Sequence, residues 1–311
     1  MDFVLSSIFI IILTAEFIMG NLGNGFIALM NYTDWVKRRK MSSVNRILTA
    51  LAISRISLLW SVMISTFISM VYPPFMMTAS MLIILNLPWT VTINFSIWFA
   101  SILSIFYFLK IANFSNSIFL YLKWRVKKVV SVTLLVCLLL LFLNIALVNA
   151  KFIWTDGSKR NMSYSSSMNS PAESYRLFLI INTLFLSVPV VVSLTMFLLL
   201  IISLWKHHKR MQHTSKRPGD ASTKAHIKAL QTVIASFLLY SIFFLSIFVQ
   251  LWSSELLKKK LFISFCEVTG MFSPSFHSYV LILGNSKLRQ ASLSVLWWLR
   301  CRCKGVEILN T

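Results

Sequence analysis

Three charged side chains stand inside stretches of sequence that are otherwise apolar, namely Glu16, Arg55 and Glu267. Where such a stretch crosses a membrane, a charge is costly, so the residue faces other helices or water and marks a functional position by default. Glu267 could pair with the cation of a ligand that enters from outside, or it could stay protonated against a neighbouring group. Both alternatives are open for Glu16 as well.

Arg55 follows Leu51-Ala52-Ile53-Ser54 in its apolar segment. A hydrogen-bonded node with Asn24 and the pair His277-Ser278 would satisfy the guanidinium and link three segments of the chain. The alternative is that the long side chain reaches out to the membrane surface. We interpret Arg55 as a node that controls conformation.

Aromatic residues make up 14% of the chain, and most are expected to be packing residues or to lie at a membrane interface. Trp89 differs from the others because it lies near the end of its apolar segment and about one turn from Asn94. We therefore predict that Trp89 forms part of a pocket wall. Pro189 lies inside another apolar segment, where it frees a backbone carbonyl and predicts a kink.

The composition indicates a membrane around these residues. Hydrophobic residues make up 57% of the chain and charged residues 13%, the mean hydropathy is +0.75 and the formal net charge is +21. The basic residues gather in short clusters between long uncharged runs, which excludes a soluble protein and favours a bilayer over a nucleic-acid partner. The four cysteines are too few for a disulfide framework, and the histidines of Trp205–Lys228 lack a companion set of acids or thiols. We expect no metal or other cofactor.

Cutting the chain at charges, prolines and polar runs leaves segments long enough to cross a bilayer, which takes about 20 apolar residues. Tyr72-Pro73-Pro74 divides one uncharged stretch into two of them. The alternation typical of a barrel is absent, so helices are the spanning element. The expected spans are Phe3–Met30, Ile47–Val71, Leu85–Ile111, Val129–Val148, Leu177–Leu204, Ala229–Trp252 and Leu261–Leu283. The predicted fold class is an all-α membrane protein, a seven-transmembrane helix bundle.

Charge decides the orientation of this bundle. Most of the 30 lysine and arginine residues share one side if the N-terminus is outside, and the positive-inside rule then places the C-terminus in the cytoplasm. The basic stretch Leu288–Lys304 predicts a short helix parallel to the membrane. Cys301 and Cys303 at its end are candidates for palmitoylation, with free thiols as the alternative. We divide the chain into a seven-transmembrane domain, 1–290, and a cytoplasmic tail, 291–311.

The longest outer loop is expected between Ala150 and Arg176. It contains the sequon Asn161-Met162-Ser163, which predicts a glycosylation site on Asn161. Similar triplets begin at Asn31, Asn94 and Asn113, but the topology places these inside the membrane or in the cytosol. We expect no glycan on these three asparagines, so they are the negative cases against which Asn161 is compared.

Blocks of sequence along almost the whole chain form a specific pattern. They are Gly23–Ile27, Leu51–Arg55, Phe106–Ser115, Lys123–Arg125, Leu199–His207, His226–Gln231 and His277–Leu288. In these blocks the chain resembles the type 2 (bitter) taste receptor family of G-protein-coupled receptors. The acidic-Arg-Tyr triplet and the Asn-Pro-x-x-Tyr motif of the large receptor family are missing. Within the bitter taste family, the run Ile111–Val130 is most similar to the broadly tuned member.

The resemblance implies a bitter taste receptor of the plasma membrane. Such a receptor binds bitter small molecules from outside and activates a heterotrimeric G protein of the gustducin and inhibitory class, which triggers phospholipase C and calcium signalling. The ligand-binding positions that it implies are Trp89, Ile93, Asn94, Phe243, Ile247 and Glu267. The positions for conformational change and G-protein coupling are Asn24, Arg55, Tyr107, Lys110, Pro189 and His277. The remaining partner is membrane lipid, and homo- or hetero-oligomers are left open.

Two other classes were weighed. A transporter or channel usually shows internal repeats with interrupted helices and paired charges in the membrane, and neither is visible in the sequence. An intramembrane enzyme needs a converging acid, nucleophile or metal set, whereas Glu16, Arg55 and Glu267 are expected at different levels. We therefore expect a receptor and no enzyme. The agonists and the ionisation of Glu267 cannot be read from the sequence.

Overall fold

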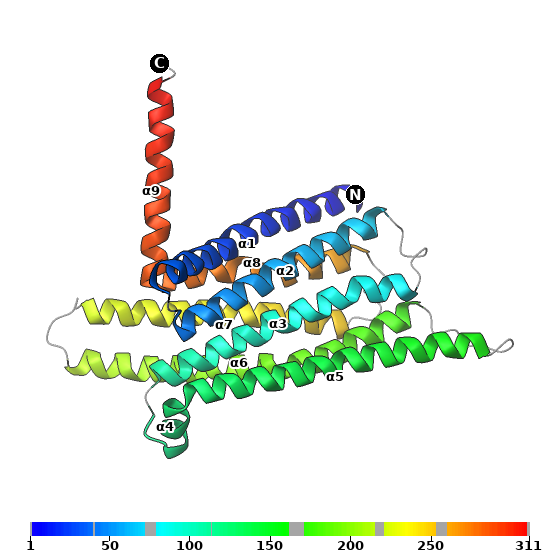
Figure 1. Cartoon of the computed structure of the whole chain (residues 1–311), viewed down its shortest axis with the longest axis horizontal. Coiled ribbons are helices and arrows are strands. Elements are labelled where there is room, and N and C mark those ends of the chain that lie inside the picture. Colours follow the sequence, from blue (N-terminus) through cyan, green and yellow to red (C-terminus); the bar gives the residue numbers. More distant parts are fainter. Residues whose placement is uncertain are drawn as a thin grey trace.

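The computed structural model describes residues 2–39, 41–71, 79–112, 114–161, 171–214, 221–252 and 260–309. Every regular element in these ranges is a helix (Figure 1). The helices are α1 (Asp2–Arg38), α2 (Ser43–Val71), α3 (Ala79–Ile111), α4 (Ser117–Trp124), α5 (Val126–Asn161), α6 (Pro171–Thr214), α7 (Ala221–Trp252), α8 (Lys260–Gly284) and α9 (Ser286–Leu309). The expected seven-helix bundle consists of α1, α2, α3, α5, α6, α7 and α8.

Six of these helices are long and apolar enough to cross a membrane by composition alone, within the described residues. The seventh spanning helix, α8, has 25 residues, about 37 Å of helix, which exceeds a hydrocarbon core of roughly 30 Å. Its composition is more polar because it carries Ser273, Ser275, His277 and Ser278, all of them buried. These side chains face the bundle instead of lipid, so α8 spans the membrane without a strongly apolar sequence.

The helices close into a ring. α1 packs against α2 and α8, α3 contacts α2, α5 and α6, and α7 joins α6 to α8. Figure 1 shows α4 and α9 at the same end of the bundle, opposite the N-terminus, with α9 running across the direction of the spanning helices. This is the orientation expected for a tail helix parallel to the membrane.

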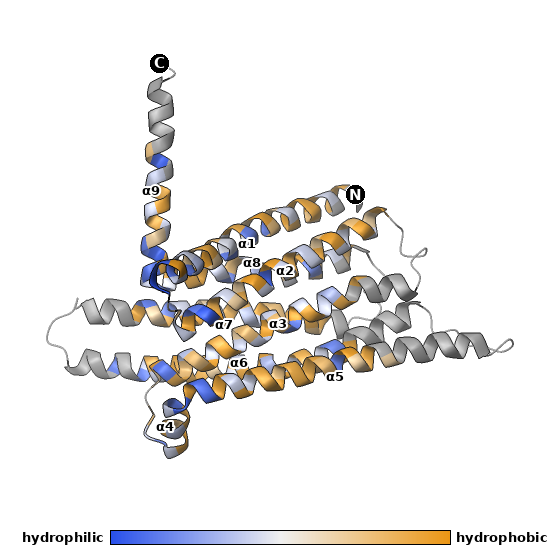
Figure 2. Ribbon diagram, viewed as in Figure 1, coloured by the Kyte–Doolittle hydropathy of each residue, from blue (hydrophilic) through white to orange (hydrophobic). Residues whose placement is uncertain are grey.

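The surface of the bundle is apolar. Figure 2 shows hydrophobic residues along the outer faces of the spanning helices, while hydrophilic residues gather near α4 and the start of α9. Phe142 on α5 is 72% exposed and Phe67 on α2 is 67% exposed. In water such surfaces would drive association, but lipid covers them without cost.

Several helices continue beyond the expected membrane spans into the segments expected to be loops. α5 continues to Asn161 and α6 begins at Pro171, so much of the expected outer loop 150–176 is helical. On the other side α6 extends to Thr214 and α7 begins at Ala221. The bilayer sets only a minimum length for a helix, which continues into water until a breaker or a cap ends it. The short helix α4, expected to be loop, begins after Asn116, whose side chain accepts from the N–H of Ile118 at 2.8 Å.

Candidate ligand and coupling sites

An apolar cluster fills the half of the bundle that is nearer the N-terminus and opposite α4 and α9. It combines side chains of α1, α2, α3, α6, α7 and α8. Four of the expected pocket residues belong to it: Ile93 and Phe243 are buried in the cluster, and Trp89 and Ile247 are partly buried against it. The packing of α3 and α7 around one core therefore brings together residues that lie about 150 positions apart in the sequence.

The polar candidates near this cluster are placed differently from one another. Asn94 is buried, and its amide donates to the carbonyl of Thr90 at 2.8 Å, one turn earlier in α3. Glu267 is half-buried on α8, next to Val268, which packs on the cluster. Glu16 on α1 is buried, and its Oε2 has no hydrogen-bond partner among the described residues. The structure therefore brings a second carboxyl group to the same half of the bundle.

A buried polar network links α2, α7 and α8. Nη2 of Arg55 lies 2.7 Å from Nδ1 of His277 and 3.4 Å from the hydroxyl of Tyr240. Nε2 of His277 lies 3.0 Å from the hydroxyl of Ser236. A guanidinium can only donate, so Nδ1 of His277 accepts and Nε2 carries the proton that is donated to Ser236. The ring of Tyr240 packs edge-on against His277, with centroids 5.6 Å apart.

The predicted node is right for His277 and wrong for its other members. Asn24 donates its amide to the carbonyl of Gly20 at 2.8 Å and to the carbonyl of Pro274 at 3.1 Å. Ser278 donates to the carbonyl of Ser275 at 3.0 Å. Asn24 thus ties α1 to α8, while Arg55 ties α8 to α2 and α7. Tyr240 and Ser236 were missed, because a hydroxyl in an apolar helix gives no signal of which neighbour it meets.

A third polar contact joins α3 to α6. Ser101 donates to the carbonyl of Pro189 at 2.8 Å, and Ser193 donates to the hydroxyl of Ser101 at 2.7 Å. α6 is continuous through Pro189 from Pro171 to Thr214. The expected kink stays a prediction. The contact with Ser101 was not predicted, although a serine in an uncharged helix is a typical interhelical donor.

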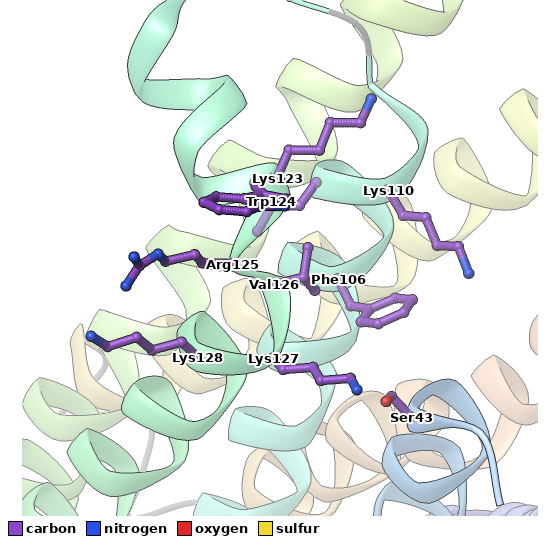
Figure 3. Close-up of a pocket in the computed structure, with 10 residues that line it drawn as sticks. Ser43, Phe106, Lys110, Lys123, Trp124, Arg125, Val126, Lys127 and Lys128 are labelled. Atoms are coloured by element: carbon purple, nitrogen blue, oxygen red, sulfur yellow. The ribbon is translucent and has the colours of Figure 1, made fainter.

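A cavity of about 770 Å³ opens at the end of the bundle that carries α4. Lys110, the last basic residue of α3, lies on its wall, and its ammonium is 5.5 Å from the ring centroid of Phe106 (Figure 3). Tyr107 is half-buried and packs edge-on against Phe106, 6.3 Å between centroids. The expected coupling residues of α3 therefore sit at the cytoplasmic end of the bundle.

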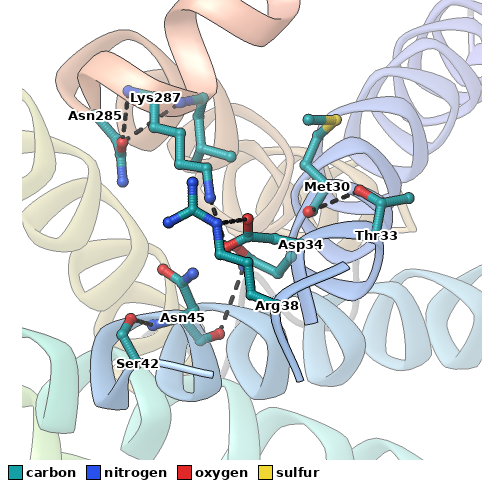
Figure 4. A network of polar contacts seen from close by, with 10 residues as sticks. Met30, Thr33, Asp34, Arg38, Ser42, Asn45, Asn285 and Lys287 are labelled. Carbon is teal, nitrogen blue, oxygen red and sulfur yellow. Dashed lines mark hydrogen bonds and ion pairs between the residues drawn. The ribbon is translucent and has the colours of Figure 1, made fainter. Parts of the chain in front are cut away.

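An ion-pair cluster fixes the base of α9. Asp34 on α1 lies 2.5 Å from Nζ of Lys287 and 3.2 Å from Nε of Arg38 (Figure 4). The side chain of Asn285 accepts from the N–H of Lys287 at 3.0 Å, which caps the start of α9. Sequence reasoning missed Asp34, since nothing in the sequence shows that the ends of α1 and α8 meet.

The remaining predicted sites are only partly covered by the structure. Asn161 is the last residue of α5, and the rest of its sequon, Met162 and Ser163, lies outside the described residues. Cys301 is an exposed free thiol, whereas the side chain of Cys303 lies outside the described part. No group of three or more metal-ligating side chains occurs among the described residues.

The closed ring of seven long helices, with basic segments at one end, is the architecture of a seven-transmembrane receptor. A family model described as "Taste receptor protein (TAS2R)" matches residues 1–300. Similar proteins include taste receptor type 2 member 14 of Macaca mulatta, 56% identical over 308 residues that cover 99% of this chain and 97% of that protein. Member 140 of Rattus norvegicus is 54% identical over 300 residues, 96% of both chains. The chain belongs to this taste receptor family and is a multi-pass protein of the plasma membrane.

Proposed function

We propose that this receptor binds bitter small molecules from the extracellular side and activates a heterotrimeric G protein of the gustducin and inhibitory class, followed by phospholipase C and calcium release. The observation that carries the proposal is the apolar cluster in the outer half of the bundle. It brings Trp89 and Ile93 of α3 together with Phe243 and Ile247 of α7. Glu267 comes directly before Val268, which packs on this cluster, and in our proposal it meets the cation of a ligand.

An apolar, aromatic-lined site suits ligands of modest size that are held mainly by burial, with few fixed polar contacts. Micromolar affinity, about −8 kcal/mol, is enough for a detector of dietary compounds. Asn94 is the polar ligand-binding candidate on α3: its amide donates to the carbonyl of Thr90, and its side-chain oxygen can accept a hydrogen bond from a ligand.

Signalling requires that the ligand bind one arrangement of the bundle better than another. The contacts of Arg55 with His277 and Tyr240, of Asn24 with Pro274, and of Ser101 with Pro189 connect different helices below the ligand site. A ligand that shifts α3, α7 or α8 must break some of these contacts and form others in their place. They are the switch points of the proposed mechanism.

On the cytoplasmic side, Tyr107 and Lys110, the segment around α4 and the basic end of α6 would contact the G protein. In this scheme residues 1–290 form the receptor domain and 291–311 the cytoplasmic tail, with α9 lying on the inner leaflet. Membrane lipid surrounds the bundle. Homo- or hetero-oligomers are compatible with the apolar outer face but are not required by the mechanism.

Calcium release in cells that express the chain with a promiscuous G-protein chimera tests the proposal, with a chemically diverse set of bitter compounds. Trp89→Ala should shift or abolish responses, because it removes an aromatic wall of the ligand site. Trp35→Ala is the matched control: Trp35 is exposed at the cytoplasmic end of α1 and packs only obliquely on Tyr32. Loss in both variants alike, at equal surface expression, would contradict the pocket, and ion flux without ligand would contradict the receptor.

A further inference from the structure

Basic side chains line the cavity at the cytoplasmic end of the bundle. Lys110 of α3, Lys127 of α5 and Ser43 of α2 lie on its wall. In Figure 3, Lys127 and the hydroxyl of Ser43 point toward one another, with Lys110 and the ring of Phe106 on the same side. Ser43 is the first residue of α2, so the positive end of a helix dipole adds to the two ammonium groups.

The charge on this wall is not balanced by acids of the same region. The sequence from Lys110 to Lys128 holds five basic residues and contains no aspartate or glutamate. Of these, Lys123 donates to the carbonyl of Ala112 at 3.0 Å, and Arg125 lies over the rings of Tyr121 and Trp124. Both ion pairs found in the described part of the chain use Asp34 of α1, whose carboxylate is engaged by Lys287 and Arg38. The cavity thus concentrates positive charge.

The surroundings of the cavity are those of a lipid interface. α4 exposes large apolar side chains: Trp124, which lines the cavity, is 83% exposed, and Ile118 is 69% exposed. Tryptophan prefers the headgroup level of a bilayer, where an amphipathic helix buries its apolar face. Arg125 and Lys128 also line the cavity and, in Figure 3, point away from Ser43 on the side of Trp124. An occupant of the cavity is therefore in reach of the inner leaflet.

We propose that this cavity binds the phosphorylated headgroup of an anionic inner-leaflet phospholipid, such as a phosphoinositide. The headgroup phosphates lie between Lys110, Lys127 and Ser43, and the acyl chains extend past Trp124 along α4 and α5. A phosphomonoester carries close to two negative charges at neutral pH and accepts several hydrogen bonds, which matches two ammonium groups, a hydroxyl and a helix N-terminus better than a single carboxylate does. The bound lipid would hold the ends of α2, α3 and α5 together.

The test uses the purified full-length receptor in phosphatidylcholine nanodiscs. Binding of a fluorescent phosphatidylinositol bisphosphate is measured for the parent, for Lys110→Gln/Lys127→Gln and for Lys206→Gln/Lys209→Gln. The control pair lies at the cytoplasmic end of α6, is exposed, removes the same charge and does not line the cavity. The cavity variant should bind about tenfold more weakly than the parent, since each lysine near an anionic lipid headgroup contributes severalfold, and the control should bind nearly as the parent does.

Three outcomes would overturn the proposal. Equal loss in both variants would mean that the lipid senses only the overall basic surface. Competition by free inositol trisphosphate as strong as that by the lipid would make the cavity a site for a soluble phosphate. Unchanged lipid binding together with weaker capture of the G protein by the cavity variant would assign the cavity to the G protein.

A second measurement on the parent receptor does not depend on how the variants fold. A photoactivatable phosphoinositide is cross-linked in the same nanodiscs, and the labelled peptides are identified by mass spectrometry. Labels on 106–128, with Trp124 and its neighbours among them, support the proposal. Labels confined to α9 or to the ends of α6 and α7 would place the lipid elsewhere and overturn it.

Discussion

A hydrogen bond of 2.7 Å joins Nη2 of Arg55 in α2 to Nδ1 of His277 in α8, 222 positions later in the sequence. Both side chains are almost fully buried. Nε and Nη1 of Arg55 have no hydrogen-bond partner among the described residues, so this charge depends on few contacts. Buried groups of this kind are strongly coupled, because removing one partner leaves the other unsatisfied.

A double-mutant cycle measures that coupling. Arg55→Met and His277→Leu should each lower the thermal midpoint of the purified receptor by several degrees, because each leaves a buried polar partner behind. The double variant should lose less than the two single losses together, with an interaction free energy of about 1–3 kcal/mol. Strict additivity of the two losses would show that the pair is not coupled in the membrane.

The apolar cluster of the outer half makes a prediction for ligand binding. Phe243 is buried in it, whereas Phe142 on α5 faces lipid. Phe243→Ala should raise the half-maximal agonist concentration by about 10- to 100-fold, the usual effect of deleting a buried aromatic anchor. Phe142→Ala removes the same side chain and should leave the dose–response curve in place. Calcium release at matched surface expression provides the measurement, and a shift of equal size in both variants would contradict the site.

Glu267 makes a prediction about ligand charge. Glu267→Gln keeps the shape of the side chain and removes its ability to carry a negative charge. Cationic agonists should lose about tenfold in potency, as expected for a charge-assisted contact, and neutral agonists should keep theirs. Glu16→Gln is the matched comparison, since Glu16 lies in the same half of the bundle on α1. If neutral agonists lose as much as cationic ones, Glu267 supports the fold of α8 and does not bind the ligand cation.

The sequence predicts the membrane spans of this structure better than it predicts the ends of the helices. Six of the seven spans follow from hydropathy alone, because lipid forces every backbone group in the membrane into a helix. Their ends in water do not, as α5 and α6 show: both extend past their expected limits. Outside the bilayer a helix ends at a capping or helix-breaking residue. These signals are weak in the Ser- and Asn-rich segment after Ala150.

The candidate sites show the same division. Trp89, Ile93, Phe243 and Ile247 were assigned to one site from the family resemblance, and the packing of α3 and α7 brings them into one cluster. Of the two partners of Arg55, His277 was predicted and Tyr240 was not. From the sequence alone, Tyr240 and Asn24 are equally plausible acceptors for the guanidinium. Which of them meets the guanidinium depends on the rotation of α1 and α7 about their axes. Hydropathy does not encode that rotation when a helix is apolar on nearly all sides.

Two glycines of α1 give a stability prediction with an internal control. A Cβ on Gly23 would lie 3.1 Å from Cβ of Ser278 and 3.1 Å from Cε2 of Tyr279, both on α8, whereas a Cβ on Gly25 would meet nothing within 4 Å. Gly23→Ala should therefore force α1 away from α8 and cost about 1–3 kcal/mol. Gly25→Ala should be neutral or stabilising by up to about 1 kcal/mol, since alanine favours a helix. Thermal unfolding of the two purified variants checks this, and equal midpoints would show that α1 is not held closely against α8.

Glycosylation tests the orientation of the whole bundle. Asn161 ends α5 at the end of the bundle opposite α4 and α9, and an N-terminus outside the cell requires that end to face the lumen during synthesis. Asn161→Gln should remove a glycan, seen as faster migration on a gel that matches the parent after glycosidase treatment. Asn31→Gln, Asn94→Gln and Asn113→Gln alter the other triplets and should leave the glycan in place. A glycan that is lost on changing Asn31 or Asn113 would mean that α4 and α9 lie outside the cell, and the proposed positions of the ligand and G-protein sites would have to be exchanged.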